Sequence, residues 1–108
     1  MLYTKNSSQR GVWGGQMIKS YRHNGLKELT ETGKTARIDA KFHARCLEAL
    51  DAINSAADLR SLNRPAFRLH QLKQFKPVRY SIWISAQWRI TFEWDKGEAY
   101  RVDFEQYH

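Results

Sequence analysis

The sequence has little cysteine, no long apolar run and few acidic side chains, and each shortage excludes a class of protein. Cys46 is the single cysteine among 108 residues, so no disulfide can form within the chain and a disulfide-stabilised secreted scaffold is excluded. No apolar stretch approaches the roughly 20 residues that cross a bilayer, and the N-terminal residues lack an apolar stretch of signal-peptide length. We therefore expect a cytoplasmic protein with no role at a membrane.

Acidic residues are outnumbered by basic ones, 11 against 18, which gives a formal net charge of +7 and an isoelectric point near 9.8. A small domain this basic favours a polyanionic partner, which can be RNA, DNA or an acidic protein. Charge alone does not choose among these partners. The hydrophobic content of 42% is enough for one compact domain with its own core.

The first 16 residues differ from the rest because they show no periodic apolar pattern. This segment, MLYTKNSSQRGVWGGQ, is polar and glycine-rich and carries no acidic side chain. Patterned sequence begins at Met17. We expect residues 1–16 to be an N-terminal extension outside the fold, and residues 17–108 to form the domain.

The first half of the domain is predicted to be mainly helical. A short strand is expected at 18–21, followed by a helix over 24–32 that Asn24 caps and Gly33 ends. A longer helix is expected after Asp39 as its cap. Apolar residues recur at helical spacing within it, namely Phe42, Cys46, Leu50 and Ile53.

After Asn63-Arg64-Pro65 the apolar period changes to two, which is typical of strands with one buried face. The alternating apolar residues fall into four groups: Phe67 and Leu69; Tyr80, Ile82 and Ile84; Trp88, Ile90, Phe92 and Trp94; Tyr100, Val102 and Phe104. Asp95-Lys96-Gly97 predicts a tight hairpin between the last two strands. The expected fold is α+β: a strand, two helices and four strands, with the helices packed on one face of an antiparallel sheet.

The other face of the sheet is expected to carry basic side chains. If the apolar residues face the helices, the opposite face receives Arg68, His70, Arg89, Thr91 and Arg101. Three more cations, Lys73, Lys76 and Arg79, fall in or beside the loop that follows His70. Such a surface could follow a phosphate backbone. The alternative is an ordinary solvated sheet face, on which Arg89 would pair with Asp103 or Glu93 across the strands.

Two sequence blocks and the chain end resemble a known family. The blocks are NRPAFRLH at 63–70, continued by Gln71-Leu72-Lys73, and YSIWISAQWRITFEW at 80–94. The chain ends in Tyr107-His108, and it opens at Met17 with MIKSY. Together these features are similar to HigB-type toxins of the RelE/ParE toxin–antitoxin superfamily, over the range 17–108.

The resemblance implies a RelE-like fold and a ribosome-dependent endoribonuclease that cleaves mRNA in the A site of the small subunit. The sequence itself has no His, Cys and Asp cluster at metal-ligand spacing and no glycine-rich phosphate loop, so neither a metal nor a nucleotide cofactor is expected. The resemblance also implies a partner, a HigA-like helix-turn-helix antitoxin. The catalytic residues that it implies are His70, Lys73, Arg89, Tyr107 and His108, and the basic residues expected to contact RNA or the ribosome are Arg68, Lys76, Arg79 and Arg101. The sequence departs from the family at Gln106, where an acidic residue often stands, and Glu105 one step earlier is expected to face the other side.

These residue types suit RNA cleavage by the substrate's own 2′ hydroxyl group. Histidine can exchange protons near neutral pH, and cations can stabilise the charge that develops on the phosphate. Two alternatives remain open: a ParE-like protein that binds and inhibits gyrase, and a basic RNA-binding module without catalysis. Neither alternative needs His70 or the Tyr107-His108 end.

Because residues 1–16 contribute no periodic apolar surface, we predict that a protein starting at Met17 keeps its fold and its toxicity. Thermal melting of both forms provides the measurement, and the two melting temperatures should differ by only a few degrees. A large drop in the melting temperature of the shorter form would instead identify the segment as part of the folded domain.

Overall fold

The structure, a computed structural model, describes residues 17–107, so the expected extension at 1–16 and the expected catalytic His108 lie outside the described residues. Its elements are α1 (Asn24–Thr32), η1 (Ala40–Phe42), α2 (His43–Ser55), η2 (Leu59–Leu62), η3 (Pro65–Phe67), β2 (His70–Leu72), β3 (Arg79–Trp83), β4 (Trp88–Asp95) and β5 (Glu98–Gln106), where η marks a 3₁₀ helix. None of the helices within 17–107 has the length and apolar character needed to span a membrane.

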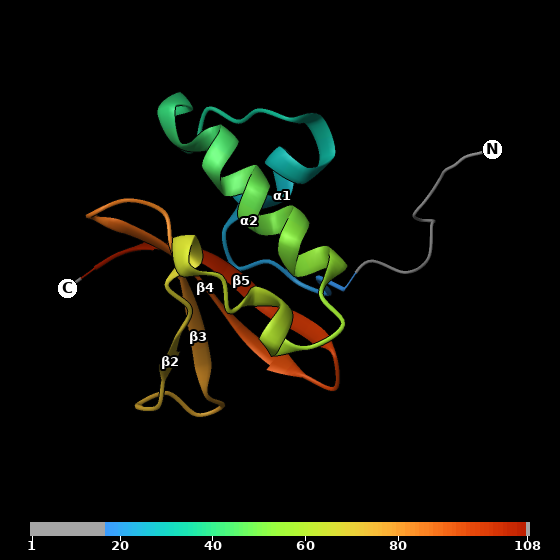
Figure 1. Cartoon of the computed structure of the whole chain (residues 1–108). Coiled ribbons are helices and arrows are strands. Elements are labelled where there is room, and N and C mark those ends of the chain that lie inside the picture. The colour runs from blue at the N-terminus through green and yellow to red at the C-terminus, as the bar shows by residue number, and fades with distance from the viewer. Residues whose placement is uncertain (1–16, 108) are drawn as a thin grey trace.

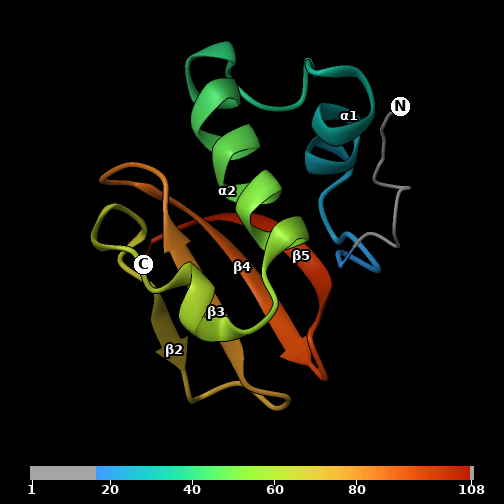
Figure 2. The same ribbon diagram turned by 45° about the vertical axis from the view of Figure 1, so that its right-hand side comes forward.

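Four antiparallel strands form one sheet in the order β2-β3-β4-β5. The two α-helices lie together on one side of this sheet, and α2 runs above its strands (Figure 1). The turned view shows the same two layers, with the segment that contains η2 and η3 connecting α2 to β2 (Figure 2). The expected α+β class, with helices on one face of an antiparallel sheet, is confirmed.

The segment at 18–21, expected to be a strand, instead makes two isolated parallel bridges to β5, from Ile18 to Ala99 and from Tyr21 to Val102. The backbone of β5 explains the interruption. Arg101 lies between the two bridges with a φ of 49°, in the left-handed region. Its N–H bonds to the Ser20 hydroxyl group at 2.8 Å rather than to a backbone carbonyl. A continuous ladder therefore breaks at this position.

The helix ends follow the expected positions with small shifts. The N-cap of helix α1 is His23 and not the expected Asn24, because the His23 imidazole accepts a hydrogen bond from the Gly25 N–H. Asn24 is the first residue of the helix. Gly33 ends the helix as expected, with a φ of 85°. Asp39 caps the 3₁₀ turn η1, which leads directly into α2.

The first sheet strand begins at His70, three residues later than the period-two pattern predicts. Pro65 fixes its own φ and opens the 3₁₀ turn η3, so Phe67 belongs to a helical turn although its side chain is buried in the core as expected. Arg68 ends η3 with a φ of 47°. The hairpin between β4 and β5 is confirmed, since Lys96 and Gly97 both have positive φ.

The core lies between the helices and the covered face of the sheet. Its largest fully buried side chains include Leu26, Leu29, Leu50 and Ile53 from the helices, and Ile82, Ile90, Phe92 and Val102 from the sheet. Each side chain of this kind contributes about 1.5–3 kcal/mol through its removal from water. Cys46 is fully buried among them, as its place on the apolar stripe predicts.

The uncovered face of the sheet contains a buried ionic group, which we call the Arg79 cluster: Arg79, Thr91, Glu93, Arg101 and Glu105. Arg79 is 3% exposed. Its guanidinium donates to the Glu93 carboxylate at 3.1 Å, to the Thr91 hydroxyl group at 2.9 Å and to the Arg101 carbonyl at 2.8 Å. Glu93 also pairs with Arg101 at 3.5 Å, and Thr91 donates to Glu105. These bonds tie β3, β4 and β5 together.

We predict that Arg79→Met lowers the free energy of unfolding by about 3 kcal/mol, because it leaves the Glu93 carboxylate buried with a single partner. The double variant Arg79→Met/Glu93→Leu removes both charges and should lose less stability than the single variant. Urea unfolding measures both, with the exposed Arg60→Ala as control. Equal losses for the single and double variants would contradict the structural role given to this pair.

Burial raises the pKa of the Cys46 thiol to about 12, although the nearby Arg45 charge acts in the opposite direction. At pH 8 the fraction of Cys46 in the reactive thiolate form is therefore roughly a thousandfold lower than that of an ordinary cysteine. We predict that the folded protein resists a thiol reagent at this pH, whereas the protein unfolded in guanidinium reacts at the ordinary rate. Similar rates for the two states would show that Cys46 is accessible.

Candidate active site

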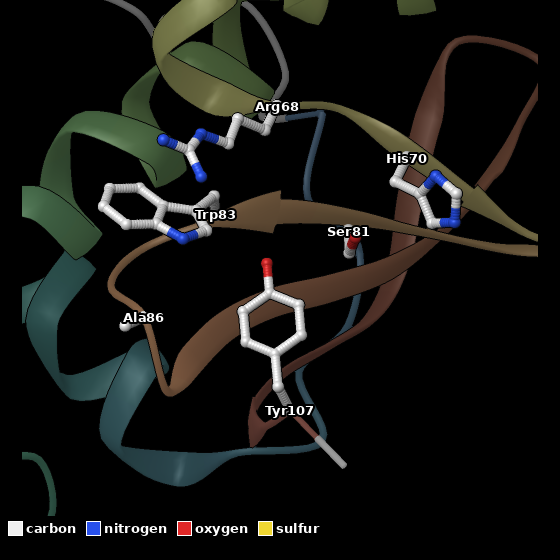
Figure 3. A pocket seen from close by; sticks show the side chains of 6 residues that line it. All are labelled: Arg68, His70, Ser81, Trp83, Ala86 and Tyr107. Atoms are coloured by element: carbon white, nitrogen blue, oxygen red, sulfur yellow. The ribbon is translucent and has the colours of Figure 1, made fainter.

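An open pocket of about 410 Å³ lies on the uncovered face of the sheet, at the end near the last residues of β5. Six residues line it: Arg68, His70, Ser81, Trp83, Ala86 and Tyr107. Figure 3 shows that they come from three places: the segment that leads into β2, strand β3 with the loop after it, and the chain end. The pocket unites Arg68, His70 and Tyr107, which the sequence analysis singled out.

His70 enters the pocket as the first residue of β2. It pairs with Ser81 of β3 in the antiparallel register, so both side chains emerge on the same face. The His70 side chain is exposed, whereas Ser81 is 2% exposed beside it. Sequence reasoning did not single out Ser81, although the alternation with Tyr80 and Ile82 places it on the uncovered face.

Tyr107 reaches the pocket from the chain end, just after β5. Its backbone N–H donates to the Gln87 carbonyl at 2.9 Å, which holds this residue against the loop between β3 and β4. Burial raises the pKa of the Tyr107 phenol, and the charges of Arg89 and Arg68 act against this rise. The hydroxyl group therefore stays protonated at neutral pH and can both donate and accept a hydrogen bond.

Arg89 lies behind Tyr107, with the centre of its guanidinium 5.1 Å from the centroid of the tyrosine ring. It makes no ion pair with any acidic residue of the described part, so the expected alternative of pairing with Asp103 or Glu93 is not what the structure contains. Its Nε is buried and has no hydrogen-bond partner within 17–107. Arg89 does not itself line the pocket, but it brings a positive charge behind Tyr107 that has no ion-pair partner among residues 17–107.

The opposite side of the pocket is formed by Trp83 and Arg68, and Arg45, which does not line the pocket, supports Trp83. The Arg68 guanidinium lies 4.6 Å from the Trp83 ring centroid, and the Arg45 guanidinium lies 5.9 Å from it. Arg45 also donates to the Trp83 carbonyl at 3.3 Å and to the Ala66 carbonyl. Since Arg45 belongs to α2, these bonds connect the helical layer to the pocket wall.

Four of the expected site residues lie apart from the pocket. Lys73 and Lys76 are exposed in the loop between β2 and β3 and do not line it. Arg79 and Arg101 belong to the Arg79 cluster, where each pairs with Glu93. With 3% exposure, Arg79 has no surface to offer a phosphate group, so its expected RNA contact is not carried forward.

The uncovered face is therefore less basic than the alternation suggested. Acidic residues compensate the cations at one end of it, and Thr91, expected as a surface residue, is fully buried. Glu105 points to this same face: it stands opposite Arg89 in the register and accepts from the Thr91 hydroxyl group. Gln106 pairs with Trp88 instead. Glu105 and Gln106 therefore face opposite sides of the sheet, as the sequence predicts.

Comparison with known proteins gives two matches. Residues 19–108 match the family of HigB-like toxins, described as "RelE-like toxin of type II toxin-antitoxin system HigB". The chain is also 42% identical to "Endoribonuclease HigB" of Proteus vulgaris over 92 residues, which cover 85% of this chain and all of that relative. The family match spans most of the chain and includes both sequence blocks and the Tyr107-His108 end. The chain belongs to the family of HigB-like toxins of type II toxin–antitoxin systems.

Proposed function

We propose that this toxin is an endoribonuclease that cleaves mRNA on the ribosome. One observation carries the proposal: the pocket brings together His70 and Tyr107, which are far apart in the sequence, and the Arg89 guanidinium lies behind the tyrosine ring. The name of the Proteus vulgaris relative, an endoribonuclease, supports the same reaction.

The proposed reaction uses the substrate's own 2′ hydroxyl group as nucleophile. The 2′ oxygen forms a bond to phosphorus as the bond from phosphorus to the 5′ oxygen breaks, leaving a 2′,3′-cyclic phosphate and a 5′ hydroxyl group. One proton leaves the 2′ hydroxyl group and one reaches the departing 5′ oxygen. His70 and His108 are proposed to exchange these two protons, since imidazole can do so near neutral pH.

Arg89 is proposed to stabilise the negative charge that develops on the phosphate oxygens. Its charge has no acidic partner among the described residues, and its orientation is held by the Tyr107 ring. A cation fixed in advance, in a partly desolvated place, stabilises a developing charge more than a mobile one does. Tyr107 is proposed to hydrogen-bond the phosphate or to stack on a base, and Lys73 to contact the approaching backbone.

The ribosome and an antitoxin complete the proposal. Lys76, Arg68 and Arg101 are exposed and are proposed to contact RNA or the ribosomal small subunit. The natural partner is proposed to be a HigA-like helix-turn-helix antitoxin, and the compartment is the cytoplasm, where translated mRNA is found. Residues 17–108 are proposed to form the toxin domain, with residues 1–16 as an extension outside it.

We predict that His70→Ala and the deletion of His108 each lower cleavage by about 10²–10⁴-fold, because each removes a proton-transfer group. Arg89→Ala should lower cleavage by roughly a hundredfold or more. The measurement is cleavage of a ribosome-bound message, beside thermal melts of each variant. Arg60→Ala serves as the matched control, since Arg60 is 93% exposed and lies outside the pocket. Wild-type cleavage by the three site variants would overturn the catalytic assignment.

The same toxin expressed without its antitoxin should arrest growth and produce new 5′ ends inside reading frames. Mapping the 5′ ends of cellular RNA after induction measures this. If DNA breaks accumulate and no new RNA ends appear, the protein is instead a gyrase inhibitor. If the protein binds RNA and no new 5′ ends appear, the protein is an RNA-binding module without catalysis.

A further inference from the structure

Phe75 lies exposed in the loop between β2 and β3, outside the pocket. Phe75 and Tyr107 are the exposed large hydrophobic side chains of residues 17–107, with 38% and 37% exposure. Tyr107 belongs to the pocket, whereas Phe75 does not line it. The Phe75 ring also stacks on no other aromatic ring in the described part of the chain. The loop therefore presents an aromatic ring to solvent.

The backbone of this loop holds Phe75 at a defined place. The Phe75 N–H donates to the Leu72 carbonyl at 3.3 Å, which closes a turn directly after β2. Residues 73–77 are all exposed. Both overall views show the loop projecting from the ends of β2 and β3, on the side of the molecule away from the two α-helices (Figure 1, Figure 2). A partner that approaches the sheet from this side can therefore reach Phe75.

The part of the chain that contains this loop carries only positive charge. No acidic residue occurs between Asp58 and Glu93 in the sequence. Within the loop, Lys73 and Lys76 stand on either side of Phe75, and neither lysine forms an ion pair with residues 17–107. Cations that contact phosphate groups, beside an aromatic ring that stacks on a base, are the means by which proteins bind single-stranded nucleic acid. The loop thus matches RNA better than an acidic protein surface, which would need the cations alone.

The loop also continues directly from the strand that bears His70. Strand β2 is three residues long, so Leu72 lies only about 7 Å from His70 along the strand. One RNA strand can therefore occupy the pocket and the loop at the same time. A base that stacks on Phe75 belongs to a nucleotide beyond the two that the cleaved phosphate joins, because Phe75 does not line the pocket.

We propose that the loop at 73–78 is a second RNA-binding site, in which the Phe75 ring stacks on an unpaired base of the message a few nucleotides from the cut. Lys73 and Lys76 contact the phosphate groups on either side of that base. The inference rests on the proposed endoribonuclease function. Every base has a π-face, so this contact carries no sequence preference. Phe75 is thus a substrate-binding residue that holds the strand beside the pocket, while proton transfer stays with the histidines.

The test combines variants of Phe75 with messages that lack one base. Each ribosome-bound message carries a single abasic nucleotide, at successive positions on both sides of the cut, and kcat/KM for cleavage is measured for each message. Phe75→Leu keeps an apolar side chain and removes the ring, whereas Phe75→Tyr keeps the ring. Gln74→Ala is the matched control, since Gln74 is an exposed residue of the same loop. Thermal melts of every variant show whether it is folded.

Phe75→Leu should lower kcat/KM on the intact message by about fivefold to a hundredfold, whereas Phe75→Tyr and Gln74→Ala should cleave as the wild type does. One abasic position beyond the cleaved pair should cost the wild type a similar factor and cost Phe75→Leu nothing further. Wild-type cleavage by Phe75→Leu overturns this inference and leaves the proposed function standing. A loss in Phe75→Leu that no abasic position reproduces in the wild type also overturns it, because the ring then binds ribosomal RNA or a protein. Should Phe75→Leu fail to fold, the wild-type scan decides alone, and absence of cleavage by the wild type overturns the proposed function as well.

Discussion

The Arg79 guanidinium is the interaction on which the uncovered face of the sheet depends. It is buried and binds side chains or carbonyls of two further strands, so it fixes how β3, β4 and β5 lie relative to one another. A buried charge of this kind is tolerated only when its hydrogen bonds are well formed. The bulge at Arg101 supplies one of the acceptors, the Arg101 carbonyl, by turning the β5 backbone into the left-handed region. The irregular backbone and the buried charge therefore support each other.

This arrangement divides the uncovered face into two halves. At one end of β3, Arg79 stands opposite Glu93, and at the other end Trp83 stands opposite Arg89, about 13 Å away along the strand. In the first half, the Glu93 carboxylate pairs with both Arg79 and Arg101. No acidic side chain of the described part pairs with Arg68 or Arg89. The positive charge at the pocket end comes from Arg68 and Arg89, although Glu105 stands opposite Arg89 in the register.

Much of the fold follows from local sequence, and the site follows from it only in part. The two apolar periods predict the helices and strands, and Lys96-Gly97 predicts the hairpin, because these signals act over a few residues. The period-two pattern predicts a start of β2 three residues before the observed one, because Pro65 opens a helical turn that includes Phe67, the first residue of that pattern. The sequence does not predict the burial of Arg79, because that burial depends on the register with Glu93, which lies 14 residues along the chain. Ser81 and Arg68 entered the pocket through register and backbone conformation, which residue type alone does not reveal.

The ion pairs with Glu93 lie at one end of the strands, so the two ends of the uncovered face differ in charge. Glu93 pairs with Arg79 and Arg101 at one end of the strands, whereas Arg68 and Arg89 at the other end form no ion pair with residues 17–107, so the field of this face differs from one end to the other. A polyanion that approaches from solution experiences a torque from such a field before any atom makes contact. Its backbone is therefore drawn to the pocket end first, and this orienting effect weakens as salt shortens the range of the field. The position of one acid, Glu93 opposite Arg79 at the end of the strands away from the pocket, therefore affects how a polyanion approaches the protein and not only how it finally binds.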